Sequence, residues 1–537
     1  MLSRSLLRRA AIAGMAPILL GALLLGATAR AETIDPSDVN ILYTGRWADA
    51  NPSRPWAQAK ASSIIANFQG TGIAVTLSMT RTNERFRVII DDDAAGSSKI
   101  VIPSGALFTL ASGLPDGVHK VEIIKETDEG RATLFDFELD AGKTLVAPPA
   151  RPPRRIVFYG DSNLAGYSLE SERNDTSYPL AGSYYTYAGI VSRMFDAEHH
   201  NISWGGATIQ TLNISYNRVG WNAPNPAWDF NRFVADLVVV NIGANDVWRT
   251  EADIKADYNN LLDDLRIAHP SSHIMLYNAW GWDFNETANY IHEVIAGRAD
   301  PDMSSAIFPW LFEQYHGCET DHSGMAYYLV EHVSSVMGWT AGPMDVVNGY
   351  GVNGNVANGS FDEIAPFGGW GWRYFDDSGV SRVHDPAGAY HGEYYLRLFN
   401  TASSHQSNPA SDGDPVSVTA WMRGESDGDR VFMSIDFRNQ DQGAEPDTPM
   451  QIETEIKTLT TEWQQYSMTS TAPTDASDPV FSNRITFQAD VSAAVHVDRV
   501  VASVPEPSAW LQLVAGTGGL LLLYRRRGRR ADDIIEN

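Results

Sequence analysis

The chain has 537 residues, too many for a single hydrophobic core, so several domains are expected. A formal net charge of −26 excludes an extended nucleic-acid-binding surface, because such a surface needs clustered lysine and arginine. A hydrophobic fraction of 43% with 20% charged residues is ordinary for soluble globular protein.

Residues 1–31 have the pattern of a secretory signal peptide. A basic start precedes an apolar stretch from Ala10 to Leu25, and Ala29-Arg30-Ala31 fits a small-x-small cleavage site. The alternative is an uncleaved membrane anchor, for which the apolar stretch is short and is interrupted by glycine and proline. The chain is therefore expected to be exported. Its single cysteine, Cys318, allows no intrachain disulfide.

Residues 33–148 are predicted to form an N-terminal β-sandwich of the jelly-roll kind. Short strand patterns separated by turn residues support this fold. The patterns lie at 64–68, 72–77, 85–90 and 119–125. A proline-rich segment, 148–153, then reads as a stiff linker.

Residues 155–342 alternate between apolar strands and helical segments, which predicts a three-layer α/β domain. Candidate buried parallel strands lie at 156–159, 237–242 and 273–277, and candidate helices at 253–268 and 326–337. Residues 344–500 return to short strands, among them 416–422 and 430–437, and predict a second β-sandwich at the C-terminal side.

The first candidate for chemistry is Ser162 in Gly160-Asp161-Ser162. This tripeptide follows directly on the strand 156–159, at the sheet edge where open α/β sheets gather ligands and catalytic groups. Gly-Asp-Ser is also an ordinary turn composition, so the assignment depends on partners for the serine. A serine nucleophile needs an adjacent base and hydrogen-bond donors for the oxyanion.

Three later positions offer these partners in order along the chain. Gly206 falls where the next strand should end, and Asn245 follows the strand 237–242. His322 stands before the helix expected at 326–337, where its imidazole could fold back on Ser162.

Together Ser162, Gly206, Asn245 and His322 resemble the four motif positions of the SGNH, or GDSL-type, hydrolases. The resemblance implies that His322 is the general base and that the N–H groups of Ser162 and Gly206 and the Asn245 amide hold the oxyanion. It implies no metal or cofactor. Glu319 would orient the imidazole, and Asp321 or a backbone carbonyl are the alternatives for that role.

The segments 41–47, 68–73 and 113–121 look like the N-terminal β-sandwich of carbohydrate esterase family 2. This resemblance implies a serine esterase that removes O-acetyl groups from polysaccharides such as xylan or glucomannan. Trp248, Trp280 and Trp282 follow expected strand ends and could form a sugar-facing wall, although each could equally be core. Two alternatives stay open: an SGNH esterase acting on non-glycan esters, and a non-catalytic glycan-binding surface protein.

In the expected C-terminal sandwich, residues 358–363 and the aromatic cluster Trp370, Trp372 and Tyr374 resemble the openings of carbohydrate-binding modules. Aromatic rings stack on sugar faces, but in a β-sandwich they also fill cores. Sugar binding by this region is therefore one of two interpretations.

Residues 504–530 join Pro505-Glu506-Pro507, an apolar span at 509–524 and an arginine cluster. The order resembles the PEP-CTERM sorting signal of Gram-negative bacteria. It implies processing by exosortase-type machinery, transient membrane association through the span, and a final place at the cell surface, outer envelope or extracellular matrix. A plain tail anchor is the alternative, with the arginines as its cytoplasmic end.

Overall fold

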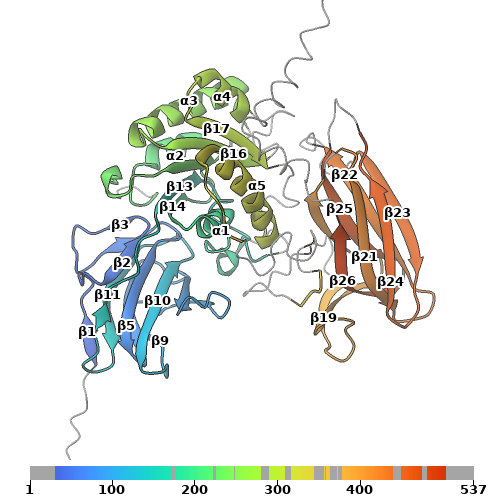
Figure 1. Ribbon diagram of the computed structural model, residues 1–537, viewed down its shortest axis with the longest axis horizontal. Helices are drawn as coiled ribbons and strands as arrows, with labels where there is room; N and C mark the ends of the chain where they lie inside the picture. The colour runs from blue at the N-terminus through green and yellow to red at the C-terminus, as the bar shows by residue number, and fades with distance from the viewer. Residues whose placement is uncertain are drawn as a thin grey trace, which may run out of the picture.

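The computed structural model describes the chain in ten ranges and a few further positions. These are 31–171, 176–221, 225–246, 248–279, 290–308, 316–343, 378–410, 412–439, 449–474 and 480–503, with Val356, 359–362 and Trp372. Figure 1 shows them as coloured ribbon. Residues 1–30 of the signal-peptide pattern, the segment 504–530, Trp280 and Trp282 lie outside the described residues. No helix within the described ranges is long and apolar enough to cross a membrane.

The N-terminal β domain consists of two six-stranded antiparallel sheets around one core. One sheet contains β1 (Glu32–Ile34), β3 (Trp47–Ala48), β4 (Trp56–Ala57), β6 (Ile73–Met79), β9 (Leu107–Ala111) and β11 (Ala132–Leu139). The other contains β2 (Ile41–Thr44), β5 (Ser63–Gly70), β7 (Phe86–Ile90), β8 (Ser98–Ile100), β10 (Gly117–Lys125) and β12 (Leu145–Val146). The four expected strand patterns fall in β5, β6, β7 and β10.

The central sheet is parallel throughout and has the order β14-β13-β15-β16-β17. Its strands are β13 (Arg154–Gly160), β14 (Ala197–Ser203), β15 (Leu237–Asn241), β16 (His273–Ala279) and β17 (Met303–Phe308). The three expected strands correspond to β13, β15 and β16. Because β13 pairs with β14 on one side and β15 on the other, the chain reverses direction across the sheet at β13. Ligands bind at such a switch point in open α/β sheets.

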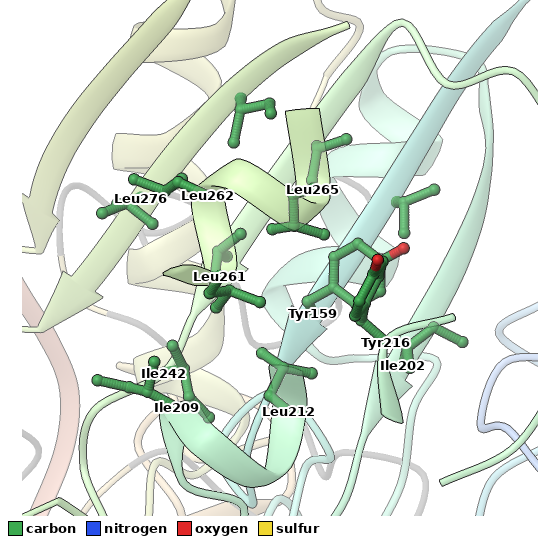
Figure 2. Close-up of a cluster of buried hydrophobic side chains, with 14 of the residues drawn as sticks. Tyr159, Ile202, Ile209, Leu212, Tyr216, Ile242, Leu261, Leu262, Leu265 and Leu276 are labelled. Atoms are coloured by element: carbon green, nitrogen blue, oxygen red, sulfur yellow. The ribbon is translucent and has the colours of Figure 1, made fainter. Parts of the chain in front are cut away.

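Helices cover both faces of this sheet, as expected for three layers. Alternate side chains of β13 explain why: Ile156 and Phe158 enter one core, and Val157 and Tyr159 enter the other. The first core includes α1 (Tyr187–Met194) and α5 (Glu319–Met337). The second includes α2 (Ile209–Ser215), α3 (Glu251–Ala268) and α4 (Ile291–Arg298). Figure 2 shows part of the second core, with Leu261 and Leu265 of α3 over the sheet.

The N-terminal β domain inserts Arg46 into the central domain. Its guanidinium is fully buried and donates to the backbone carbonyls of Tyr216 and Arg218, each at 2.6 Å, and to the Tyr159 hydroxyl at 2.8 Å. Ala59 of the same domain joins the core that includes α2, α3 and α4. The two domains therefore share buried polar and apolar contacts.

The last helix of the central domain begins earlier than the sequence pattern indicates. The helix expected at 326–337 is α5, which starts at Glu319. Asp321 Oδ2 accepts a hydrogen bond from the Cys318 backbone N–H at 2.9 Å, which satisfies one of the free donors at the helix start. Residues 319–325 therefore belong to the helix, and His322 lies inside it.

The C-terminal region is β-rich, with two antiparallel sheets around one core. One has the order β18 (Val380–His384), β19 (Tyr394–Phe399), β26 (Ala494–Ser503), β21 (Pro415–Gly424) and β24 (Gln464–Thr471). The other has the order β20 (Ser403–Pro409), β25 (Val480–Ala489), β22 (Arg430–Asn439) and β23 (Gln451–Thr458). Trp372 is fully buried in this core, so it is no sugar platform. Trp370 and Tyr374 lie outside the described residues.

Candidate active site

Ser162 lies in the turn that leaves the carboxyl end of β13. The turn begins at Gly160, where a Cβ atom would lie 2.5 Å from the Asn241 carbonyl oxygen of the neighbouring β15, so only glycine fits. Asp161 accepts a hydrogen bond from the Asn163 backbone N–H at 3.0 Å, and Ser162 O accepts one from the Tyr167 N–H at 3.1 Å. These bonds fix the backbone on both sides of the serine.

The imidazole that lies against the Ser162 hydroxyl is that of His316. Its Nε2 lies 2.8 Å from Ser162 Oγ, within hydrogen-bond distance for proton transfer. His316 is in the segment between β17 and α5, where it precedes the helix start at Glu319. Burial lowers its pKa below the usual value, which keeps the ring neutral and able to accept a proton at neutral pH.

His322 is not placed against Ser162, in contrast to the expectation from the sequence. It lies in the first turns of α5, fully buried, and its Nδ1 accepts a hydrogen bond from the Tyr187 backbone N–H of α1 at 3.2 Å. Its ring stacks on the Tyr187 ring with the centroids 5.7 Å apart. His322 therefore joins α1 to α5. The physical reason for the difference is the early start of α5, which takes His322 out of the preceding segment.

Asp321 and Glu319, the two carboxylates expected near the base, lie in other surroundings. Asp321 caps α5 through the Cys318 N–H. The Glu319 side chain is buried, and among the described residues its carboxylate oxygens accept no hydrogen bond, so it orients neither histidine directly. Burial raises the pKa of Glu319 to about 7, against the lowering effect of Arg87, Arg193 and Lys99. Glu319 thus belongs to a buried charge cluster beside the N-terminal β domain.

Gly205 and Gly206, which follow β14, and Asn245, which follows β15, lie next to the turn that carries Ser162. Gly206 follows β14 with a φ of 73°, which favours glycine, and it is exposed. Asn245 follows β15, and its Nδ2 donates to the carbonyl of Ala207 at 2.9 Å. An amide carries two N–H donors, so this bond leaves one to serve a ligand. Gly205 is the more confined of the glycine pair, because a Cβ atom there would lie 3.2 Å from the Tyr167 hydroxyl oxygen, whereas one on Gly206 would meet no atom within 4 Å.

Two further carboxyl groups close to the site are kept partly neutral by burial. Desolvation raises the pKa of Asp161 to about 7, and that of Asp246 to about 6. The charge of Asp246 also raises the pKa of Asp161. Fewer ionised carboxylates near Ser162 mean less repulsion of an oxyanion that forms there.

The N-terminal β domain reaches this site through Lys60. The Lys60 ammonium donates a hydrogen bond to the Ala165 carbonyl, in the loop after Ser162, and lies 4.7 Å from the centre of the Tyr167 ring. The Tyr167 ring in turn lies 6.3 Å from the ring of His316, centre to centre. Lys60, Tyr167 and His316 were not identified from the sequence.

Of the three tryptophans expected to face sugar, one is described by the structure. Trp248 follows Asn245 closely and is 76% exposed, which removes the core interpretation for it. Trp280 and Trp282 lie outside the described residues. An additional aromatic pair flanks the glycine block, where Trp204 stacks on Trp221 with centroids 5.9 Å apart.

Comparisons with known proteins cover the N-terminal and central domains. Residues 43–149 match the model of the carbohydrate esterase 2 N-terminal domain, and residues 158–307 match that of the GDSL-like lipase/acylhydrolase family. The chain is 28% identical over 336 residues to a cellulase/esterase, CelE, from Acetivibrio thermocellus, covering 57% of this chain and 41% of that protein. It therefore spans less than half the length of that relative.

Two further proteins are similar over nearly their whole length. An acetylxylan esterase / glucomannan deacetylase from Cellvibrio japonicus is 25% identical, and the alignment covers 57% of this chain and 92% of that protein. The solved structure of a family two carbohydrate esterase from Clostridium thermocellum in complex with cellohexaose is 26% identical, with a TM-score of 0.51 over 56% of this chain and 99% of that one. The N-terminal domain thus matches the carbohydrate esterase 2 N-terminal model and the central domain matches the GDSL-like lipase/acylhydrolase model, and the similar solved structures include a carbohydrate esterase of family two.

Proposed function

We propose that the protein is a serine esterase that removes O-acetyl groups from a polysaccharide of the xylan or glucomannan type. The observation that carries the proposal is the 2.8 Å contact between Ser162 Oγ and His316 Nε2 at the carboxyl end of the central strand. The substrate class follows from the two domain families and from the activity named for the Cellvibrio japonicus relative.

In the proposed reaction, Ser162 Oγ attacks the acetyl carbonyl carbon while His316 Nε2 takes the hydroxyl proton. The carbonyl oxygen becomes an oxyanion, which the Gly206 N–H and the second N–H of the Asn245 amide stabilise, with the Ser162 N–H as the third donor. The bond from carbon to the sugar oxygen then breaks, and His316 gives its proton to that oxygen. Acetyl-Ser162 remains.

Water completes the cycle. His316 takes a proton from the water as its oxygen attacks the acetyl carbon, a second oxyanion forms in the same place, and Ser162 leaves with the proton returned by His316. Acetate is released. Glu319 is not assigned an orienting role in this scheme, because among the described residues its carboxylate forms no hydrogen bond to either histidine.

The exposed Trp248 beside Asn245 supports a glycan substrate, since an indole face provides a flat apolar surface for a pyranose ring. We propose the same role for Trp280 and Trp282 on sequence position alone. The signal pattern at 1–31 and the tail pattern at 504–530 support export and sorting to the envelope by exosortase-type machinery, with transient membrane association through the apolar span.

The test is acetate release from acetylated xylan and acetylated glucomannan by the full-length protein, with the S162A variant as the control. Wild type should release acetate and S162A should lose activity by about 10⁴-fold or more. In parallel, a series of nitrophenyl esters should show a preference for acetyl over acyl chains of eight carbons. Preference for the long chains would overturn the polysaccharide assignment, and activity retained by S162A would overturn the nucleophile.

A further inference from the structure

A hollow on the C-terminal β-rich region is far in sequence from the serine site. It has a volume of about 360 Å³, within the range of small-ligand sites. It is lined by Tyr390, Thr419, Trp421, Gln465, Arg499 and Val501. These residues come from β26, β21 and β24, which are neighbouring strands of the five-stranded sheet (Figure 1), and from the loop before β19.

The strand pattern places these side chains on the outer face of the sheet. Along β21, Val418, Ala420 and Met422 are buried in the core, whereas Thr419 and Trp421 between them are half-buried. Trp421 pairs with Gln465 of β24 across the sheet. The hollow therefore lies opposite the core, and filling the core does not account for its aromatic residues.

A buried carboxylate fixes the loop that carries Tyr390. Asp498 of β26 is fully buried, and its Oδ2 accepts the backbone N–H groups of Tyr390 and His391, both at 2.8 Å. Its Oδ1 accepts the Arg499 N–H at 2.6 Å. Tyr390 is thereby held over Trp421, with ring centroids 3.7 Å apart and planes 13° from parallel. Both rings remain partly exposed, and Trp463 lies 6.3 Å from Tyr390, centre to centre.

The strand beside Trp421 is distorted at Arg499. The pairing of β21 with β26 shifts register between Thr419 and Trp421, and Arg499 has a φ of 46°, which is unfavourable for a residue with a side chain. Bulges of this kind redirect a side chain and persist where the surroundings hold them. Here the Asp498 hydrogen bond to the Arg499 N–H holds it.

Two polar side chains at the rim carry unused hydrogen-bonding groups. Arg499 and Gln465 are exposed, and within the described ranges neither side chain forms a hydrogen bond or ion pair. The aromatic stack can pack against a flat apolar face of a ligand. The Arg499 guanidinium and the Gln465 amide beside it can hydrogen-bond hydroxyl groups at the edge of that ligand. A pyranose ring has this character. The net charge of −26 disfavours a polyanionic ligand such as a nucleic acid.

We propose that this hollow, the Trp421 site, binds sugar units of a polysaccharide chain, independently of the esterase site. A pyranose ring in the hollow packs against the exposed part of the Tyr390–Trp421 pair, and Arg499 and Gln465 bond its hydroxyl groups. The Trp421 site would hold the polymer while Ser162 acts on acetyl groups elsewhere on it. Trp372, singled out in the sequence, has no part in it, because it is buried in the core.

The experiment measures retention of the full-length protein in native gels that contain deacetylated xylan or deacetylated glucomannan. Variants W421A and R499G are compared with I456A, a control on the outer face of the other sheet, where Ile456 is 53% exposed. Glycine suits the positive φ at position 499, so R499G removes the guanidinium without adding backbone strain. Nitrophenyl acetate hydrolysis reports the serine site separately.

We expect wild type and I456A to be retarded by at least one of the two glycans, W421A to lose about tenfold or more in affinity, and R499G several-fold. All four proteins should hydrolyse nitrophenyl acetate equally. Retardation of W421A equal to that of wild type, or no retardation of wild type by either glycan, would overturn the Trp421 site. If wild type hydrolyses no ester, the proposed function is overturned and the binding result still stands.

Discussion

The Lys60 ammonium of the N-terminal β domain donates a hydrogen bond to the Ala165 carbonyl, in the loop that follows Ser162. Lys60 is fully buried, and its Nζ lies 3.7 Å from Oδ1 of the equally buried Asp128. It also lies over the Tyr167 ring, and the Tyr167 hydroxyl oxygen would be 3.2 Å from a Cβ atom on Gly205. The N-terminal β domain therefore contacts the loop after Ser162 directly, and it contacts the segment with Gly205 through Tyr167.

Replacing Lys60 by methionine should lower both stability and turnover. K60M removes the donor to Ala165 and takes from Asp128 a charge partner whose attraction opposes its burial. Breaking a buried pair typically destabilises by about 3 kcal/mol or more. Displacement of the serine loop should lower kcat by about tenfold or more. Urea unfolding and acetyl ester hydrolysis measure the two effects.

The double variant K60M/D128N separates the loss of stability from the loss of turnover. Because it leaves no buried charge at the pair, it should recover most of the lost stability, whereas kcat should stay low because the Ala165 contact is still missing. If K60M alone has wild-type turnover, Lys60 does not support the serine loop.

His316 and His322 should respond differently to the same substitution. H316N removes the imidazole on Ser162 and should lower kcat by about 10⁴-fold or more, with little effect on stability. H322N alters the buried contact between α1 and α5 and should destabilise by about 1–3 kcal/mol, with kcat of the folded protein within roughly tenfold of wild type.

Both variants are compared by steady-state hydrolysis of an acetyl ester at a temperature where circular dichroism shows the fold intact. The reverse pattern, with turnover lost in H322N and kept in H316N, would restore His322 as the base and overturn the present assignment.

The contrast between the two histidines shows how far sequence patterns reach. The strands at β13, β15 and β16 are strongly apolar, so they and the polar turns with Ser162 and Asn245 could be predicted. The start of α5 is missed when apolar periodicity alone is used, because residues 319–325 lack a strong apolar pattern. Glu319 and Asp321 are the acidic first-turn residues typical of a helix start, and they would have placed that start before His322.

Contacts between domains were beyond prediction for another reason. Lys60 and Arg46 are charged side chains in turn-rich segments, which composition places on the surface. Their burial depends on carbonyl oxygens of Ala165, Tyr216 and Arg218, which are distant in sequence. Only the packed tertiary structure brings such partners together.

Asn245 should contribute to the transition state more than to substrate binding. In N245A the amide donor proposed for the oxyanion is lost, so kcat should fall by about 10²–10³-fold while KM changes little. Full kinetic curves on an acetyl ester give the two constants separately. A rise in KM at unchanged kcat would mean that Asn245 binds the substrate uniformly and does not stabilise the oxyanion.

The pH profile of kcat/KM should fall on the acid side with a midpoint below 6.5. Protonated His316 cannot accept the Ser162 proton, and burial lowers the pKa of its imidazole below that ordinary value. Asp161, whose pKa is raised to about 7, could produce a similar limb. D161N removes that titration and keeps an oxygen to accept the Asn163 N–H. An acid limb that shifts or disappears in D161N would assign it to Asp161.

Glu319 should make the fold less stable as pH rises, because burial raises the pKa of its carboxyl group to about 7 from an ordinary value of 4.5. Below pH 4.5 the group is protonated in both folded and unfolded chains. Between 4.5 and 7 the unfolded chain releases the proton and the folded chain keeps it, so stability falls with pH and stays lower above 7.

E319Q has no such titration. The free energy of unfolding of E319Q, measured relative to that of wild type, should therefore be higher at pH 8 than at pH 4.5, by roughly 3 kcal/mol at most. Urea unfolding of both proteins at these two pH values measures the change, and the comparison cancels the titration of all other groups. An unchanged difference between E319Q and wild type would mean that Glu319 is ionised at its ordinary pKa, and that Arg87, Arg193 and Lys99 fully offset its burial.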